Sequence, residues 1–74
     1  MTLITAVAGI GSPIAFRPIK TLDFPKDTLV GAIRRGHETL TPRGDTEIYP
    51  GDELILLTTR NREAEAREWL RRNT

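Results

Sequence analysis

The stretch LDFPKDTLVGAIRRGHETLTPRGDTEIYPGDELILL, residues 22–57, decides the fold of this 74-residue chain. It holds one apolar segment at 28–34 (TLVGAIR) and the start of a second at 53–59 (ELILLTT). Both segments are apolar on their two alternating faces, which is typical of strands that are covered on both sides. We therefore predict two central strands there, each buried on both faces.

Glycine and proline divide the rest of this stretch into turns. Arg35-Gly36 predicts a tight turn, after which residues 37–41 (HETLT) return antiparallel until Pro42 ends the strand. Two further turns at 43–45 (RGD) and 50–52 (PGD) frame residues 46–49, which have room for only a few ladder hydrogen bonds. In both turns we expect the aspartate to accept backbone N–H groups.

The flanking segments supply one more strand and two helical segments. Residues 2–8 (TLITAVA) predict a first strand that ends near Gly9, and residues 19–22 predict a helix of one or two turns between Pro18 and Pro25. A C-terminal helix follows, with Asn61 as its predicted N-cap. Its apolar stripe comprises Ala66, Trp69 and Leu70, and its oriented ion pairs are Glu63–Arg67 and Glu68–Arg72.

The predicted fold is a single α+β domain spanning residues 1–74. It has a small, mostly antiparallel sheet of four to five strands, a short first helix and a C-terminal helix. A chain this short buries only about 60% of its unfolded surface, so its own core is marginal and self-association is expected.

Composition excludes several classes of protein. The chain has no cysteine, so it cannot form a disulfide scaffold, a thiolate zinc site or a cysteine nucleophile, and this fits a reducing cytoplasm. The net charge of +1 provides no field that would hold nucleic acid. No apolar run approaches the roughly 20 residues of a membrane helix, and no basic segment precedes an apolar one as in a secretory signal.

Groups able to perform chemistry are few. His37 is the only histidine, and next to a hairpin turn it is either a solvated turn residue or a ligand contact. The acidic residues around the two turns do not match a calcium-binding loop, so we predict no metal site and no cofactor. Arg34, Arg35 and His37 gather at the hairpin tip, where they either bind an anion or keep the loop solvated. We predict that the chain is not an enzyme.

The order of motifs from residue 3 to residue 72 resembles the TrkA C-terminal domain, also called the C-terminal domain of regulators of potassium conductance. The motifs are Ser12-Pro13, Arg17-Pro18, Leu22-Asp23, the apolar strand ending in Arg34, Gly36, Pro42, Gly44-Asp45-Thr46 and Pro50-Gly51-Asp52. The resemblance implies a cytoplasmic, ligand-sensing regulatory domain of a potassium or other cation transport system. Such domains form homodimers and pass a change of shape to a membrane channel or transporter subunit, so localisation at the inner face of the membrane follows.

The resemblance also suggests where a small anionic ligand such as a nucleotide would bind. Ile19, Asp23, His37 and Pro42 fall at or near positions that line the family's cyclic di-AMP pocket, while Pro25 and Leu29 stand where those members carry arginine and asparagine. With the two tip arginines, the candidate ligand-binding residues are Ile19, Asp23, Arg34, Arg35, His37 and Pro42. The alternative is a dimerisation and docking module without ligand binding, cut from a larger transporter or antiporter.

Two positions depart from the family's pattern. Phe16 stands where members carry glycine, so the backbone turn before the first helix is expected to differ. Arg35 stands at the place of the usual aspartate or asparagine of the hairpin turn, where a positive φ would be costly.

Overall fold

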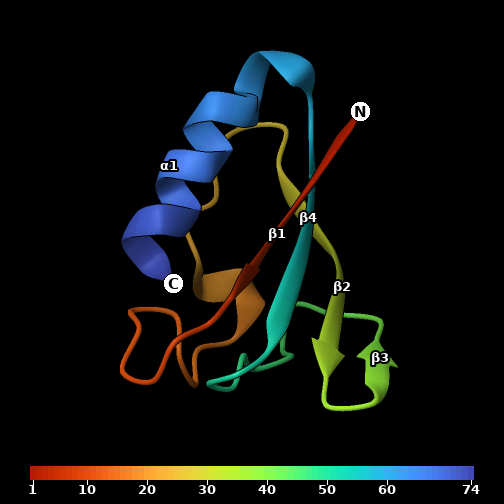
Figure 1. Cartoon of the computed structure of the whole chain (residues 1–74), viewed down its shortest axis with the longest axis vertical. Coiled ribbons are helices and arrows are strands. Elements are labelled where there is room, and N and C mark those ends of the chain that lie inside the picture. The colour runs from red at the N-terminus through yellow and green to blue at the C-terminus, as the bar shows by residue number, and fades with distance from the viewer.

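A computed structural model describes all residues from Met1 to Thr74. Four strands form one antiparallel sheet in the order β1-β4-β2-β3, and α1 packs against it (Figure 1). The predicted α+β fold with a C-terminal helix is confirmed, with four strands. The elements in chain order are β1 (Thr2–Val7), the 3-10 turn η1 (Ile19–Thr21), β2 (Leu29–Arg35), β3 (Glu38–Leu40), β4 (Glu53–Thr58), the 3-10 turn η2 (Arg60–Arg62) and α1 (Glu63–Asn73).

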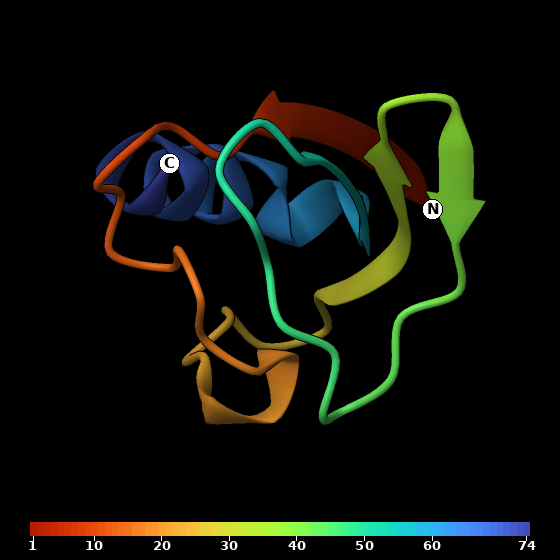
Figure 2. The same cartoon turned by 90° about the horizontal axis from the view of Figure 1, so that it is seen from below.

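The hydrophobic core lies between α1 and one face of the sheet, which we call the inner face. Figure 2 shows α1 and η1 on this same side of the curved sheet. The predicted stripe of α1 is buried, and Ile19 and Leu22 from the segment around η1 pack against the edge of the core. The buried core residues are Ile4, Ala8, Ile14, Ile33, Ile48, Leu54, Leu56, Ala66, Trp69 and Leu70.

The opposite, outer face of the sheet is uncovered, so the prediction of strands buried on both faces is wrong. In β4 the inward residues Leu54, Leu56 and Thr58 are buried, whereas Ile55 and Leu57 are only half-buried. The reason is that the chain has one helix long enough to cover a sheet face, and it covers the inner face. Across the outer face the register aligns Leu3, Leu57 and Leu29 in one row.

A β-bulge at Gly31 changes which side chains of β2 face the core. The register passes from Val30 opposite Leu56 to Ala32 opposite Ile55, so Gly31 is the extra residue. Val30 and Ile33 therefore both pack inward, which overturns the simple alternation predicted for this strand. A Cβ atom at Gly31 would lie 3.1 Å from Leu57 Cδ1, so glycine suits the close approach.

The hairpin turn lies one residue later than predicted. Arg35 belongs to β2, and the turn residues are Gly36 and His37. Gly36 has φ 62°, whereas His37 is not among the residues with positive φ, which is the pattern of a type II′ hairpin. The expected cost of a positive φ at Arg35 is therefore absent, because glycine adopts that conformation instead.

Two local predictions were wrong in detail, and a third is confirmed. The turn at 43–45 is held by the Thr46 hydroxyl, which accepts the Arg43 N–H at 2.9 Å, and not by Asp45. The prediction that residues 46–49 have room for only a few ladder hydrogen bonds is confirmed, since they form one isolated bridge, between Glu47 and Pro18. Asn61 does not cap α1, because residues 60–62 form the 3-10 turn η2 and lead directly into the helix.

Candidate functional site

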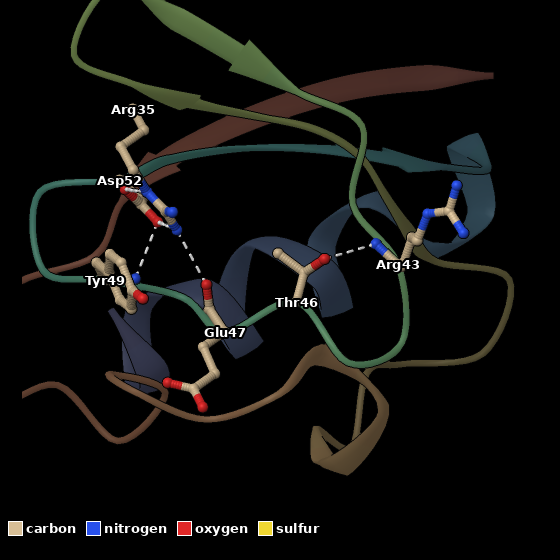
Figure 3. A network of polar contacts seen from close by, with 6 residues as sticks. All are labelled: Arg35, Arg43, Thr46, Glu47, Tyr49 and Asp52. Atoms are coloured by element: carbon tan, nitrogen blue, oxygen red, sulfur yellow. Dashed lines mark hydrogen bonds and ion pairs between the residues drawn. The ribbon is translucent and has the colours of Figure 1, made fainter.

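The end of β2 is joined to the turn before β4 by a bidentate ion pair. Arg35 Nε donates to Asp52 Oδ1 at 3.0 Å, and Arg35 Nη2 donates to Asp52 Oδ2 at 2.8 Å (Figure 3). The same Nη2 donates to the Glu47 carbonyl at 3.0 Å, and the Tyr49 N–H donates to Asp52 Oδ2 at 2.9 Å. Because the planar guanidinium and the planar carboxylate form two parallel hydrogen bonds, the pair fixes the relative orientation of the two groups and holds the turn against the hairpin.

The two partners of this ion pair differ in burial: the Asp52 carboxylate is buried, whereas the Arg35 guanidinium is partly exposed. Burial of Asp52 raises the pKa of its carboxyl, but the hydrogen bonds from Arg35 and from the Tyr49 N–H, together with the Arg35 charge, outweigh burial and leave the pKa below its ordinary value. The hydrogen bond to Asp52 raises the pKa of Arg35 above its ordinary value. Both groups therefore remain charged at neutral pH.

An aromatic pair extends the network to the surface. The Arg35 guanidinium lies 4.0 Å from the centroid of the Tyr49 ring, and the Phe16 ring lies 5.8 Å from that of Tyr49. Phe16 is 63% exposed and has φ 64°, a conformation that only glycine adopts without strain. Phenylalanine therefore makes this turn at an energetic cost.

The predicted ligand-binding residues at the hairpin differ in their freedom to bind. Arg35 uses Nε and Nη2 on Asp52 and on the Glu47 carbonyl, so it positions the hairpin tip and has only its Nη1 N–H groups left for an anion. Arg34 projects to the outer face with 61% of its side chain exposed, and its closest carboxylate is Glu53 at 3.5 Å. His37 is exposed in the turn.

The segment that follows Pro42 connects the hairpin to η1. Ile19 N donates to the Thr46 carbonyl at 3.0 Å, and Lys20 N donates to the Gly44 carbonyl at 2.8 Å. Because Arg35 also bonds the Glu47 carbonyl, the loop after Pro42 contacts both η1 and the end of β2. The structure therefore places Ile19 and Pro42 on adjoining segments.

Asp23 lies elsewhere, in an open hollow of about 310 Å³ between the segment after η1 and α1. None of the other five candidate residues lines this hollow. Its walls include the Phe24 and Trp69 rings, whose centroids are 4.5 Å apart. The lining residues are Asp23, Phe24, Pro25, Glu65, Trp69 and Arg72.

Sequence reasoning missed the partnership of Arg35 with Asp52. The expected backbone hydrogen bond to Asp52 is present, from Tyr49, but the ion pair joins residues 17 positions apart, and local turn chemistry gives no sign of it. The usable signal was an arginine at the end of an apolar strand, since an arginine at such a partly buried position requires a partner. No three acidic or histidine side chains converge on a point where they could hold a metal ion.

Comparison with known proteins decides the family. The family described as the TrkA-C domain matches residues 3–71. This chain belongs to that family. The TrkA-C domain is 40% identical over 55 residues, 74% of its length, to a Trk system potassium uptake protein TrkA homolog of Archaeoglobus fulgidus. It is 29% identical over 69 residues, 93% of its length, to TrkA homolog 1 of Methanosarcina mazei.

The chain spans only 13% and 15% of the length of these two relatives. A solved structure described as an RCK domain with cda has a TM-score of 0.77 with this TrkA-C domain at 23% identity. The alignment covers 95% of this chain and 99% of the other, so the two share the whole fold. No helix of the chain is both long and apolar enough to cross a bilayer, since α1 has 11 residues and is rich in charge.

Proposed function

We propose that this TrkA-C domain is a ligand-sensing regulatory domain of a potassium or other cation transport system and that it works as a homodimer. The observation that carries the proposal is the family match over residues 3–71, together with two relatives that are Trk system potassium uptake proteins. The domain would act in the cytoplasm, at the inner face of the membrane, through a channel or transporter subunit. Its role is not catalytic and needs no cofactor.

The uncovered outer face supports docking to the channel or transporter subunit. Leu3 and Leu29 are 59% and 52% exposed and lie in one row with Leu57. A contiguous apolar surface of this kind marks a site for another protein. Ligand binding would then act by favouring one of two dimer arrangements, with a coupling of about 1–3 kcal/mol.

The ligand in this proposal is a small anion such as a nucleotide, and the six candidate residues take different parts in binding it at the hairpin tip and the segments beside it. Arg34 and His37 supply the donors, because both are exposed and Arg34 is held only loosely by Glu53. Ile19 and Pro42 supply apolar contacts from the adjoining segments, and Arg35 holds the tip in position through Asp52. Asp23 lies in the separate hollow beside α1, so it would accept a hydrogen bond only from a ligand long enough to reach that hollow from the hairpin.

A second candidate function is dimerisation and docking without a ligand. One observation favours it, namely that the fork of Arg35 is already occupied by Asp52. The resemblance adds that Pro25 and Leu29 stand where members with a cyclic di-AMP pocket carry arginine and asparagine.

Isothermal titration calorimetry against nucleotides, cyclic dinucleotides and potassium separates the two functions. Sensing predicts saturable heat with at least one nucleotide, and this binding weakens at least tenfold in the double variant Arg34→Gln/His37→Gln. The matched control Arg67→Gln removes one arginine from α1, outside the site, and should retain the affinity. Absence of binding to the whole panel by the folded chain would favour the docking module.

A further inference from the structure

Strand β1 forms one edge of the sheet and is unusually open to another strand. It pairs only with β4, and Figure 2 shows no part of the chain beyond it. An edge strand exposes unpaired N–H and C=O groups, so soluble proteins usually protect it with charge, proline, a bulge or short length. The six residues of β1 (TLITAV) have none of these features, and the first charged side chain of the sequence is Arg17.

The other edge of the same sheet is protected. Strand β3 has three residues, begins with the charged Glu38 and is followed by Pro42. The contrast within one small sheet indicates that the openness of β1 is a specific feature and not a general property of the fold. We infer that β1 pairs antiparallel with β1 of a second copy of this chain, so that two four-stranded sheets join into one.

The backbone of β1 defines which groups are available. Just beyond the strand, Ala8 N donates to the Asp52 carbonyl at 2.8 Å and the Ala8 carbonyl accepts from Gly51 N at 2.7 Å. Ala8 thus directs both its groups toward the β4 side. In an antiparallel ladder the direction alternates, so the N–H and C=O groups of Leu3, Thr5 and Val7 point away from β4.

These three residues fit a self-complementary register. With Thr5 opposite Thr5 of the second copy, Leu3 lies opposite Val7 of that copy, and the reverse contact completes the twofold interface. Every outward backbone group of the three residues then has a partner, which gives about six hydrogen bonds. Other registers that respect the alternation leave at least one of the three residues unpaired.

The side chains favour the same arrangement. Leu3, Thr5 and Val7 all project to the outer face, and Leu3 and Val7 are 59% and 57% exposed. Cross-strand contact between Leu3 and Val7 covers apolar surface without burying a charged group. Stacking two outer faces against each other would instead carry the exposed Arg34–Glu53 pair into the interface.

This inference depends on one part of the proposed function, that the domain forms a homodimer, and it can be tested without any ligand. Sedimentation equilibrium at tens of micromolar should show a dimer for the wild type. Thr5→Lys and Thr5→Glu should each be monomeric, because like charges would meet on the twofold axis. An equimolar mixture of the two variants should sediment as a dimer, because unlike charges then face each other.

A matched control is Leu29→Lys, which places the same charge on the same outer face, with β4 between it and the β1 edge. It should remain a dimer under edge pairing. A monomeric Leu29→Lys with a dimeric Thr5→Lys would overturn the inference in favour of stacked faces. A wild type that is monomeric at all concentrations would also overturn it, and the calorimetric test of ligand sensing would be unaffected.

Amide hydrogen exchange tests the same point in the unaltered chain. Thr5 N–H has no partner in the single chain, so edge pairing predicts protection of at least tenfold that grows with protein concentration. The Gly36 N–H in the hairpin turn provides the internal comparison and should show no such dependence. A Thr5 amide that exchanges at the same rate in dilute and concentrated samples contradicts the inference.

Discussion

At the scale of single residues, Phe16 carries a measurable strain. A residue with a Cβ atom loses about 1–2 kcal/mol in the left-handed region, and the contact of Phe16 with Tyr49 offsets part of this loss. We expect Phe16→Gly to raise the free energy of unfolding by no more than about 0.5 kcal/mol, after the entropic cost of glycine and the loss of the contact with Tyr49. Urea denaturation followed by circular dichroism would measure the change.

The neighbouring Ala15 provides the control for this prediction. Its φ is not positive, so Ala15→Gly relieves no strain and should lower stability by about 0.5–1 kcal/mol. If Phe16→Gly is less stable than the wild type, the contact between Phe16 and Tyr49 is worth more than the strain. The left-handed turn at Phe16 would then carry no net cost.

Asp52 is the residue whose charge matters most to the fold. Asp52→Asn leaves Arg35 without a counter-charge. Breaking a fully buried pair in this way lowers the free energy of unfolding by about 3–5 kcal/mol. We expect a loss of about 2 kcal/mol here, because Arg35 is one-third exposed. Because the native pKa of Asp52 lies below its ordinary value of 3.8, its contribution is complete above that pH and is lost as the pH falls through the lower native pKa. The stability difference between the wild type and Asp52→Asn should therefore shrink below pH 3.8.

Urea unfolding of both proteins between pH 7 and pH 3 checks this dependence. Asp45→Asn is the matched control, because Asp45 is exposed and makes no hydrogen bond through its carboxylate, so it should change stability by less than about 0.5 kcal/mol at every pH. A constant difference between wild type and Asp52→Asn across the range would show that the charge of Asp52 does not stabilise the fold.

At the scale of elements, α1 is fastened to the segment after η1 by the Phe24–Trp69 pair. The two ring centroids are 4.5 Å apart, and Trp69 is the only tryptophan. Phe24 is half-buried, so Phe24→Ala should cost about 2 kcal/mol, below the range for fully buried phenylalanine. It should also shift Trp69 fluorescence to longer wavelength. Thr21→Ala, an exposed change in η1, should leave the emission unchanged.

The elements show which features a sequence of this kind can predict. Turn positions followed from glycine and proline, and the strands and the buried stripe of α1 followed from apolar periodicity. The bulge at Gly31 was not visible, because an extra residue in a strand changes the facing of side chains without changing composition. The cap of α1 was misplaced because η2 replaces the side-chain cap with a backbone turn.

At the scale of the whole molecule, the apolar pattern of β2 and β4 did not predict how much of the outer face is buried. It predicted strands covered on both faces, but the chain has only one helix long enough to cover a face. An apolar pattern in a sequence shows which side chains are suited to burial, but it does not show which segment covers them. For the same reason the candidate site was only partly predictable. The pairing of Arg35 with Asp52 depends on the meeting of β2 with the turn before β4, and hence on topology.

If folding and dimerisation are linked, the melting temperature of the wild type must depend on its concentration. For a domain of this size, each tenfold increase should raise the melting temperature by about 3–5 °C. Thr5→Lys should melt at one temperature throughout, whereas Leu29→Lys should keep the slope of the wild type. Differential scanning fluorimetry over two decades of concentration measures all three slopes. An equal slope for Thr5→Lys would place the dimer interface away from β1, and a flat wild type would remove the dimer altogether.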